Sequence, residues 1–264
     1  MEKVPATLRI VLIGCCAALY AIGCYLTGFI VSPWGRGQFR PAVIIPAVFA
    51  FVDPVASGAG ASIGTLIADS AKHGALYIPS LAAAVPGNFI GFYLFGRIVK
   101  KGRDWSNFLI ASLLSMIVGN AIVAFLYVPV IKVLGILPQL GAVDMVLLAT
   151  GLFIWFFATE FPFIVILVPP IVRALNSAIP SLVPYRLEMP SARRILLSTL
   201  GPGIPMILLS LAIYGFQGNI VHSLSLRLGS AYALSTVNLI WILLAFTGAL
   251  FVVVGVLTAI LLRR

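Results

Sequence analysis

The residues that can do chemistry in this sequence are polar side chains that lie inside or beside long apolar runs. Glu160, for example, sits in the middle of the run WFFATEFPF. A charged group at the centre of a bilayer costs several kcal/mol, so such residues usually face a cavity, another helix or the membrane interface. On this basis we predict a pocket that draws on Trp34, Arg36, Gln38, Arg40, His73, Asn88, Asn120 and Glu160.

Arg36, Gln38 and Arg40 lie around the start of the short apolar run 39–52. Two guanidinium groups beside a glutamine can hold a carboxylate, a phosphate or a polarised ring carbonyl. Arg40 precedes Pro41, which favours an extended backbone at Arg40. The alternative is that both arginines reach towards lipid headgroups at the interface.

The other candidates also have plainer interpretations. Trp34 can stack on a flat ligand, or it can be an ordinary interfacial anchor. Glu160 can be a structural partner of an arginine, and the polar group at 69–73 can belong to a solvated loop. Asn88 and Asn120 can each bond to a neighbouring helix.

The sequence lacks a nucleotide-binding motif and a zinc-protease motif. GxxxxGK[ST] and HExxH do not occur, and His73 and His222 are the only histidines. Asp69 and Glu160 are on different apolar runs, and nothing in the sequence brings these carboxylates together. We therefore expect neither an enzyme nor a metal or cofactor site.

Composition places these residues in a membrane protein. The chain is 61% hydrophobic and 9% charged, which is typical of membrane-spanning helices. The net charge of +10 comes from basic residues near the ends of the runs, so it indicates membrane topology and not nucleic acid. We predict an all-α integral membrane protein with spans near 8–31, 39–52, 54–71, 79–99, 106–133, 143–175, 194–216 and 231–262.

Three of these runs have unusual features. The run 39–52 is too short to cross a bilayer core of about 30 Å comfortably, which predicts a short or broken helix. Asp53–Pro54 favours a turn followed by proline at the first position of the next helix. The run 143–175 is overlong and contains three prolines, which predicts a tilted or kinked span.

Positive charge sets the predicted orientation. Cytoplasmic loops of membrane proteins are enriched in lysine and arginine. With eight crossings and both termini cytoplasmic, 12 of the 17 lysines and arginines lie inside: Lys3, Arg9, Arg97, Lys100, Lys101, Arg103, Arg173, Arg186, Arg193, Arg194, Arg263 and Arg264. We expect a plasma-membrane protein whose loop 100–104 faces the cytoplasm.

Small residues recur on one face of two spans, where they let helix backbones approach closely. Packing within the chain is one explanation, and docking of a partner chain is the other. The first stripe contains Gly14, Ala17 or Ala18, and Ala21, and the second contains Ala56, Gly60, Gly64 and Ala68.

The order of these segments resembles a known family. The stretches FRPAVIIPA, DPVASGAGASIGTLIADS, PGNFIGFYLFGRIVKKG and NFLIASLLSMIVGN follow one another between residues 8 and 175. They are similar to the substrate-binding S components of energy-coupling-factor (ECF) transporters, which import vitamins and other micronutrients. The resemblance lies in span lengths, in glycine and proline placement and in an Arg-Pro signature.

The resemblance implies an S-component-like six-helix core at 1–175, which captures a small nutrient from outside. It also implies a transmembrane coupling subunit and two cytoplasmic ATPase subunits as partners, with Ala17 and Ala21 meeting the coupling subunit. The sequence departs from the family in its tail. We expect a cytoplasmic connection at 176–193 and an extra transmembrane hairpin at 194–264.

Two other classes of membrane protein remain open. In a stand-alone secondary transporter, Glu160 or Asp69 would relay a proton or a cation. No convincing inverted repeat relates the two halves of the sequence, which weighs against this class. A structural or assembly protein would instead scatter its polar residues over lipid-facing surfaces.

Overall fold

The computed structural model describes residues 4–32, 34–102, 104–181, 183, 191–228 and 230–261. This part of the chain is helical, and the fold is all-α as predicted. Several residues used for the predicted orientation lie outside the described residues: Lys3, Arg103, Arg186, Arg263 and Arg264. Residues 182 and 184–190 of the predicted connection 176–193 also lie outside them.

Nine α-helices and two short helical segments occur among the described residues. The α-helices are α1 (Ala6–Thr27), α2 (Ile44–Val52), α3 (Pro54–His73), α4 (Val85–Val99), α5 (Trp105–Val133), α6 (Ala142–Ala178), α7 (Ala192–Gly215), α8 (Gln217–Leu228) and α9 (Ser230–Leu261). A 3-10 helix, η1 (Pro41–Val43), leads into α2, and a π-helix, η2 (Ser80–Ala84), leads into α4.

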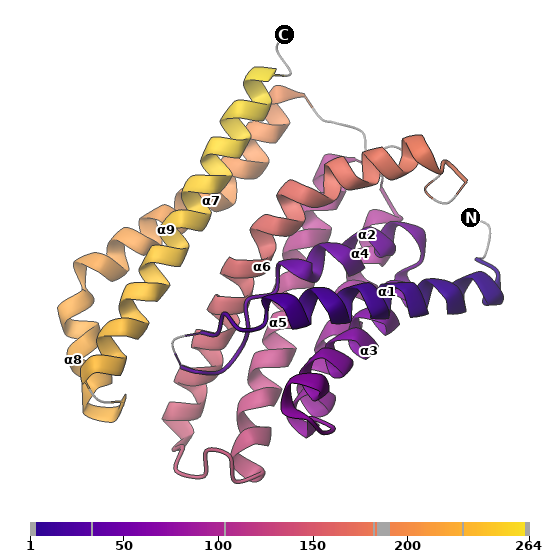
Figure 1. The fold of residues 1–264 in the computed structure, drawn as a ribbon. Coiled ribbons are helices and arrows are strands. Elements are labelled where there is room, and N and C mark those ends of the chain that lie inside the picture. The colour runs from indigo at the N-terminus through magenta and orange to yellow at the C-terminus, as the bar shows by residue number, and fades with distance from the viewer. Residues whose placement is uncertain are drawn as a thin grey trace.

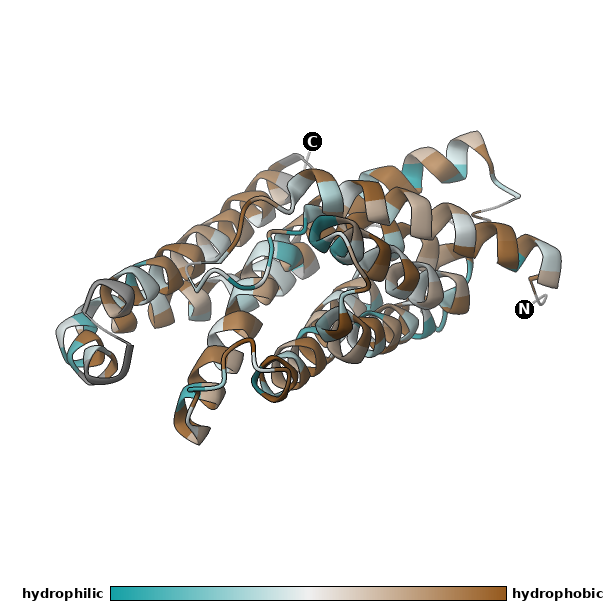
Figure 2. Cartoon of the chain, turned by 60° about the horizontal axis from the view of Figure 1, so that its bottom comes forward, coloured by the Kyte–Doolittle hydropathy of each residue, from teal (hydrophilic) through white to brown (hydrophobic). Residues whose placement is uncertain are grey.

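The protein is a multi-pass membrane protein. Six helical stretches in the described ranges are long and apolar enough to cross a bilayer, namely α1, η2 with α4, α5, α6, α7 and α9. Hydrophobic residues, brown in Figure 2, recur along all the helices, and many large apolar side chains are exposed, as expected for helices that face lipid. The α3 helix is not among the six, since its glycines, its serines and the polar residues of its last turns lower its hydropathy.

Helix boundaries confirm the short second helix and correct two other predictions. The first helix ends at Thr27 and not at residue 31, because Gly28 and the following residues turn into a loop. The helix α8 was not predicted, since its sequence QGNIVHSLSLRL lacks a long apolar run. The α6 helix continues through its three prolines as one element of 37 residues.

Helices α1 to α6 form a bundle, and α7 to α9 lie along one side of it (Figure 1). Helices α7 and α9 contact this bundle through α5 and α6. The Thr247 hydroxyl of α9 donates to the Ala158 carbonyl of α6 at 3.2 Å. The Trp105 indole of α5 donates to the Ser198 hydroxyl of α7 at 2.8 Å.

The two small-residue stripes pack against each other. Ala17 and Ala21 of α1 are buried, and a side chain at Gly64 of α3 would lie 2.7 Å from the Ala17 carbonyl oxygen. A side chain at Gly60 would lie 2.5 Å from Cys16. Packing within the chain therefore accounts for Ala17, Ala21 and the α3 stripe, whereas Gly14 is exposed and a side chain there would meet no described residue. Contact of Ala17 and Ala21 with a coupling subunit would require α1 and α3 to separate, and it stays a prediction.

A polar cluster of Arg9, Asp53 and Lys100 ties three elements together at one end of the bundle. Arg9 donates to the Asp53 carboxylate at 2.9 Å. Asp53 also caps α3 by accepting from the backbone N–H of Val55 and Ala56, with Pro54 at the first helical position as predicted. Lys100 donates to the Val52 carbonyl at 2.7 Å, and its burial lowers the pKa of Lys100 below the ordinary value of 10.5. We call this cluster the closed end.

Candidate functional site

A cavity of about 260 Å³ lies at the opposite end of the bundle. Along α1 the two ends are about 22 Å apart, at 1.5 Å per helical residue from Arg9 to Cys24. Five elements surround the cavity: the loop after α1, α3, η2 with α4, α5 and α6. It is lined by Val31, Gly35, Arg36, Gly37, Gln38, Arg40, Asp69, Lys72, His73, Tyr77, Ser80, Ala84, Asn88, Asn120, Val123, Tyr127, Phe156 and Glu160.

Seven of the eight predicted site residues are among these, and Trp34 is the exception. The cavity also holds both Asp69 and Glu160, which the sequence had given no reason to place together. The predicted residues therefore converge in space, although they come from a loop and four different helices.

The rim loop, residues 28–32 and 34–40, is shaped by glycines. Gly35 and Gly37 have φ angles of 65° and 73°, which favour glycine because a side chain is strained there. Ser32 and Gly37 pair across the loop through a backbone hydrogen bond of 3.0 Å. A side chain at Gly37 would also lie 3.0 Å from the Phe156 ring. Both glycines permit the turns of the rim loop, and Gly37 lets the loop lie directly against α6.

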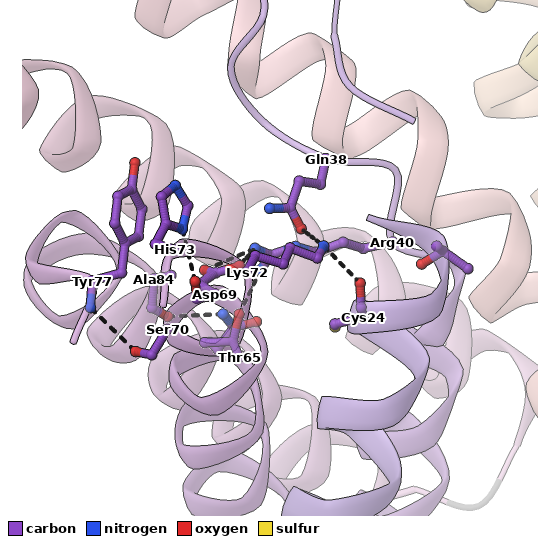
Figure 3. Close-up of polar contacts among 12 residues, drawn as sticks. Cys24, Gln38, Arg40, Thr65, Asp69, Ser70, Lys72, His73, Tyr77 and Ala84 are labelled. Atoms are coloured by element: carbon purple, nitrogen blue, oxygen red, sulfur yellow. Dashed lines mark hydrogen bonds and ion pairs between the residues drawn. The ribbon is translucent and has the colours of Figure 1, made fainter. Parts of the chain in front are cut away.

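Arg40 is already bound within the protein. Its guanidinium donates to both oxygens of Asp69 at 2.8 and 3.0 Å and to the Thr65 hydroxyl at 2.5 Å (Figure 3). Its Nε is buried and has no hydrogen-bond partner among the described residues. We predicted that the Arg40 guanidinium would bind a carboxylate of the ligand. In the structure, the Asp69 carboxylate of α3 already occupies most of that guanidinium. The Nε edge is what remains for a ligand.

Lys72 lines the cavity between the rim loop and α1. Its ammonium donates to the Gln38 side-chain oxygen at 2.7 Å and to the Cys24 carbonyl at 3.0 Å. Because the amide oxygen is occupied, the Gln38 NH₂ group is the part left for a ligand. A side chain at Gly28 would overlap the Lys72 ammonium, so Gly28 leaves the space that Lys72 fills.

Three aromatic rings form one wall near the exposed side of the cavity. His73 and Tyr77 stack with their centroids 3.7 Å apart, and the Tyr77 and Tyr127 hydroxyls lie 3.0 Å apart. His73 Nδ1 lies 2.7 Å from the Asp69 carbonyl oxygen. A carbonyl oxygen only accepts, so Nδ1 carries the hydrogen and Nε2 accepts when the ring is neutral.

A wide helical turn supplies another wall. The π-helix η2 begins at Ser80, and Ser80, Ala84 and Asn88 all line the cavity at a spacing of four residues. The Asn88 NH₂ group donates to the Ala84 carbonyl at 2.8 Å, which leaves its oxygen free to accept. π-Helical turns occur frequently at functional sites.

The deep part of the cavity holds polar groups without partners. Ser80 Oγ and Asn120 Nδ2 are buried and, like Arg40 Nε, have no hydrogen-bond partner in the part of the chain that the structure describes. Glu160 is only 5% exposed. Asn120 lies near the Glu160 carboxyl, but no acceptor meets Nδ2 at hydrogen-bonding geometry. Because buried polar groups are nearly always paired, this cavity is suited to a polar occupant.

Trp34 lies outside the cavity lining and packs on α6. A side chain at Gly151 would lie 2.6 Å from the Trp34 ring, so the indole fills the space above this glycine. The structure thus places Trp34 as a support of the rim loop, and it shows no position from which the ring stacks on a ligand in the cavity.

Sequence reasoning missed Lys72, Tyr77 and Tyr127 as lining residues. A signal for Lys72 was present, because residues three or four apart share a helix face and Lys72 follows Asp69 by three. Tyr77 follows the end of α3, and Tyr127 sits in an apolar helix, so neither had a recognisable pattern.

Comparisons of this chain with models of known protein families, with curated proteins and with solved structures found no match. Within the described ranges, no group of three His, Cys, Asp or Glu residues lies together as a metal site would require.

Proposed function

We propose that this chain is the membrane-embedded substrate-binding subunit of an ECF-type importer, which captures a small vitamin-like nutrient from outside the cell. The observation that supports the proposal is the polar cavity, in which buried atoms of Arg40, Ser80 and Asn120 lack partners. Transport would be driven by separate ATPase subunits through a coupling subunit. The chain itself would carry out no chemical step.

The size of the cavity favours a small ligand. A volume of about 260 Å³ lies just below the range of roughly 300–1,000 Å³ that is usual for drug-sized ligands. Donors and acceptors come from five elements around it, which favours a compact molecule with polar groups on several edges.

The position of the cavity agrees with capture from outside in the predicted orientation. The rim loop and the end of α3 lie at the end of the bundle opposite Arg9 and Lys100, which we assigned to the cytoplasm. The cavity would therefore open towards the outer face.

A stand-alone secondary transporter is the second candidate, and Glu160 favours it. This carboxyl is buried in the cavity and forms no ion pair with a described residue. Asp69 is a weaker candidate for a relay, because both of its oxygens accept from Arg40.

Copurification from native membranes tests the proposal. An ECF subunit should copurify with an ATPase-bearing module, and mass spectrometry should detect a small molecule released from the purified chain. Uptake that needs no ATPase module and collapses with the proton gradient would contradict the proposal and favour the secondary transporter.

A further inference from the structure

Glu160 is a buried acid with no countercharge in direct contact. Its side chain faces the cavity, and it makes no ion pair with any residue that the structure describes. An unpaired buried carboxylate is unfavourable, because it has lost water without gaining a partner. A cation from a ligand would supply that partner.

The nearby basic residues are held elsewhere. Arg40 acts on Glu160 only at a distance, since its guanidinium is held by Asp69 and Thr65. Lys72 is held by Gln38 and by a backbone carbonyl of α1. The protein therefore leaves the Glu160 carboxylate available to the cavity.

The neighbour of Glu160 adds a second recognition element. Asn120 Nδ2 is a buried donor without an acceptor, so the deep end offers one carboxylate acceptor beside one amide donor. A simple amidinium supplies N–H donors alone, whereas a protonated amino-heterocycle carries N–H donors for Glu160 beside a ring nitrogen or carbonyl that can accept from Asn120. This arrangement matches the pair of side chains.

The outer end of the cavity has the opposite charge. Arg36 lies in the rim loop and forms no ion pair with a described residue. Gln38 presents its NH₂ group there, since Lys72 occupies the amide oxygen. Both side chains suit an anionic or carbonyl group.

We infer that the ligand is a small amphoteric molecule: a cationic nitrogen group binds at Glu160 and Asn120, and an anionic or carbonyl group binds at Arg36 and Gln38. The inference rests on the proposed function, because it names the class of substrate for the same cavity.

Matched probes test each end separately. Benzamidine and benzamide differ in the charge of one planar group, and 4-amidinobenzoate adds a carboxylate to the amidine. We would measure binding of the three to the purified full chain by calorimetry, at probe concentrations up to about 10 mM, because fragments bind weakly. Glu160→Gln and Arg36→Gln serve as matched variants, since each removes one charge and keeps a hydrogen-bonding side chain.

Benzamidine should bind the wild-type chain at least about tenfold more tightly than benzamide. This difference in affinity is typical of one charge-assisted hydrogen bond. Glu160→Gln should abolish that difference, whereas Arg36→Gln should leave it unchanged. The added carboxylate of 4-amidinobenzoate should raise the affinity of wild type but not of Arg36→Gln.

Equal affinity for benzamidine and benzamide, or failure of both amidines to bind, would overturn the inference. An unchanged preference in Glu160→Gln would do the same. These failures are distinct from failure of the proposed function, which mass spectrometry of the copurified molecule and copurification of the ATPase module decide independently. A copurified nutrient without a basic nitrogen would refute the substrate class alone.

Discussion

The two ends of the bundle use the same side-chain chemistry for different purposes. Each has an arginine–aspartate pair, Arg9 with Asp53 at the closed end and Arg40 with Asp69 in the cavity. At the closed end, Asp53 also caps α3, and Lys100 satisfies a backbone carbonyl. In the cavity, by contrast, three buried polar atoms have no partner among the described residues. In the cavity, the paired polar groups hold the helices together, and the unpaired polar atoms are available to a ligand.

The two pairs also differ in the exposure of their arginines, although both carboxylates are buried. The Arg9 side chain is 39% exposed and the Arg40 side chain is 11% exposed. An exposed ion pair contributes little to stability, whereas removing one partner of a buried pair leaves an uncompensated charge. Four substitutions test this contrast, and they follow from the largest expected effect to the smallest.

Arg40→Ala should have the largest effect. It leaves the Asp69 carboxylate buried without its partner, which costs about 3–5 kcal/mol for such sites. We expect a large fall in the thermal unfolding midpoint of the purified chain as well as weaker ligand binding. Arg40→Met combined with Asp69→Leu should recover much of the stability, because no charge remains buried. If Arg40→Ala unfolded at the same temperature as the wild-type chain, the Arg40–Asp69 pair would be hydrated and not buried.

Lys72→Met should weaken the attachment of the rim loop. It removes the charge-assisted bond to Gln38, worth about 1.5–3 kcal/mol for such bonds, with the lower end expected because Lys72 is half-buried. Gly28→Ala should give a similar loss, since the added methyl group would displace the same ammonium. Thermal unfolding of the double variant provides the control. A purely additive loss would show that the two residues act separately.

Asp53→Ala should destabilise the closed end without changing the cavity. Loss of the helix cap costs roughly 1–2 kcal/mol. Asp53→Asn is the matched control, because its side-chain oxygen still accepts from the first turn of α3. The thermal unfolding midpoint should fall for Asp53→Ala, and the ligand affinity of the folded protein should stay unchanged. A parallel loss of affinity would mean that the two ends are coupled.

Arg9→Gln should have the smallest effect, about 0–1 kcal/mol, because the Arg9 side chain is largely exposed and the buried Asp53 carboxylate keeps its bonds to the Val55 and Ala56 N–H groups. Its thermal midpoint should stay close to that of the wild-type chain. A loss as large as that of Arg40→Ala would remove the contrast between the two ends.

The sequence predicted the residues that line the cavity better than it predicted their contacts. Glu160, Asn88 and Asn120 could be placed in such a lining because polar groups are costly in apolar helices. The pairing of Arg40 with Asp69 could not be identified, because it depends on how the rim loop lies on α3.

The fold shows the same limit. Apolar runs predicted most helices, and Asp53–Pro54 correctly predicted the start of α3. The α8 helix has no long apolar run, so hydropathy gave no signal for it. The small-residue stripes predicted close packing but did not identify the surface that they meet.

The π-helical turn at Ser80–Ala84 has a consequence for how this cavity can change. A π-turn contains one more residue than an α-turn. Deleting a single residue there would restore α-helical geometry and rotate the preceding segment by roughly 100° relative to α4. Tyr77 and Ser80 would leave the cavity wall while Asn88 stayed in place. One deleted codon is therefore enough to exchange one side of the cavity lining without altering the rest of the bundle.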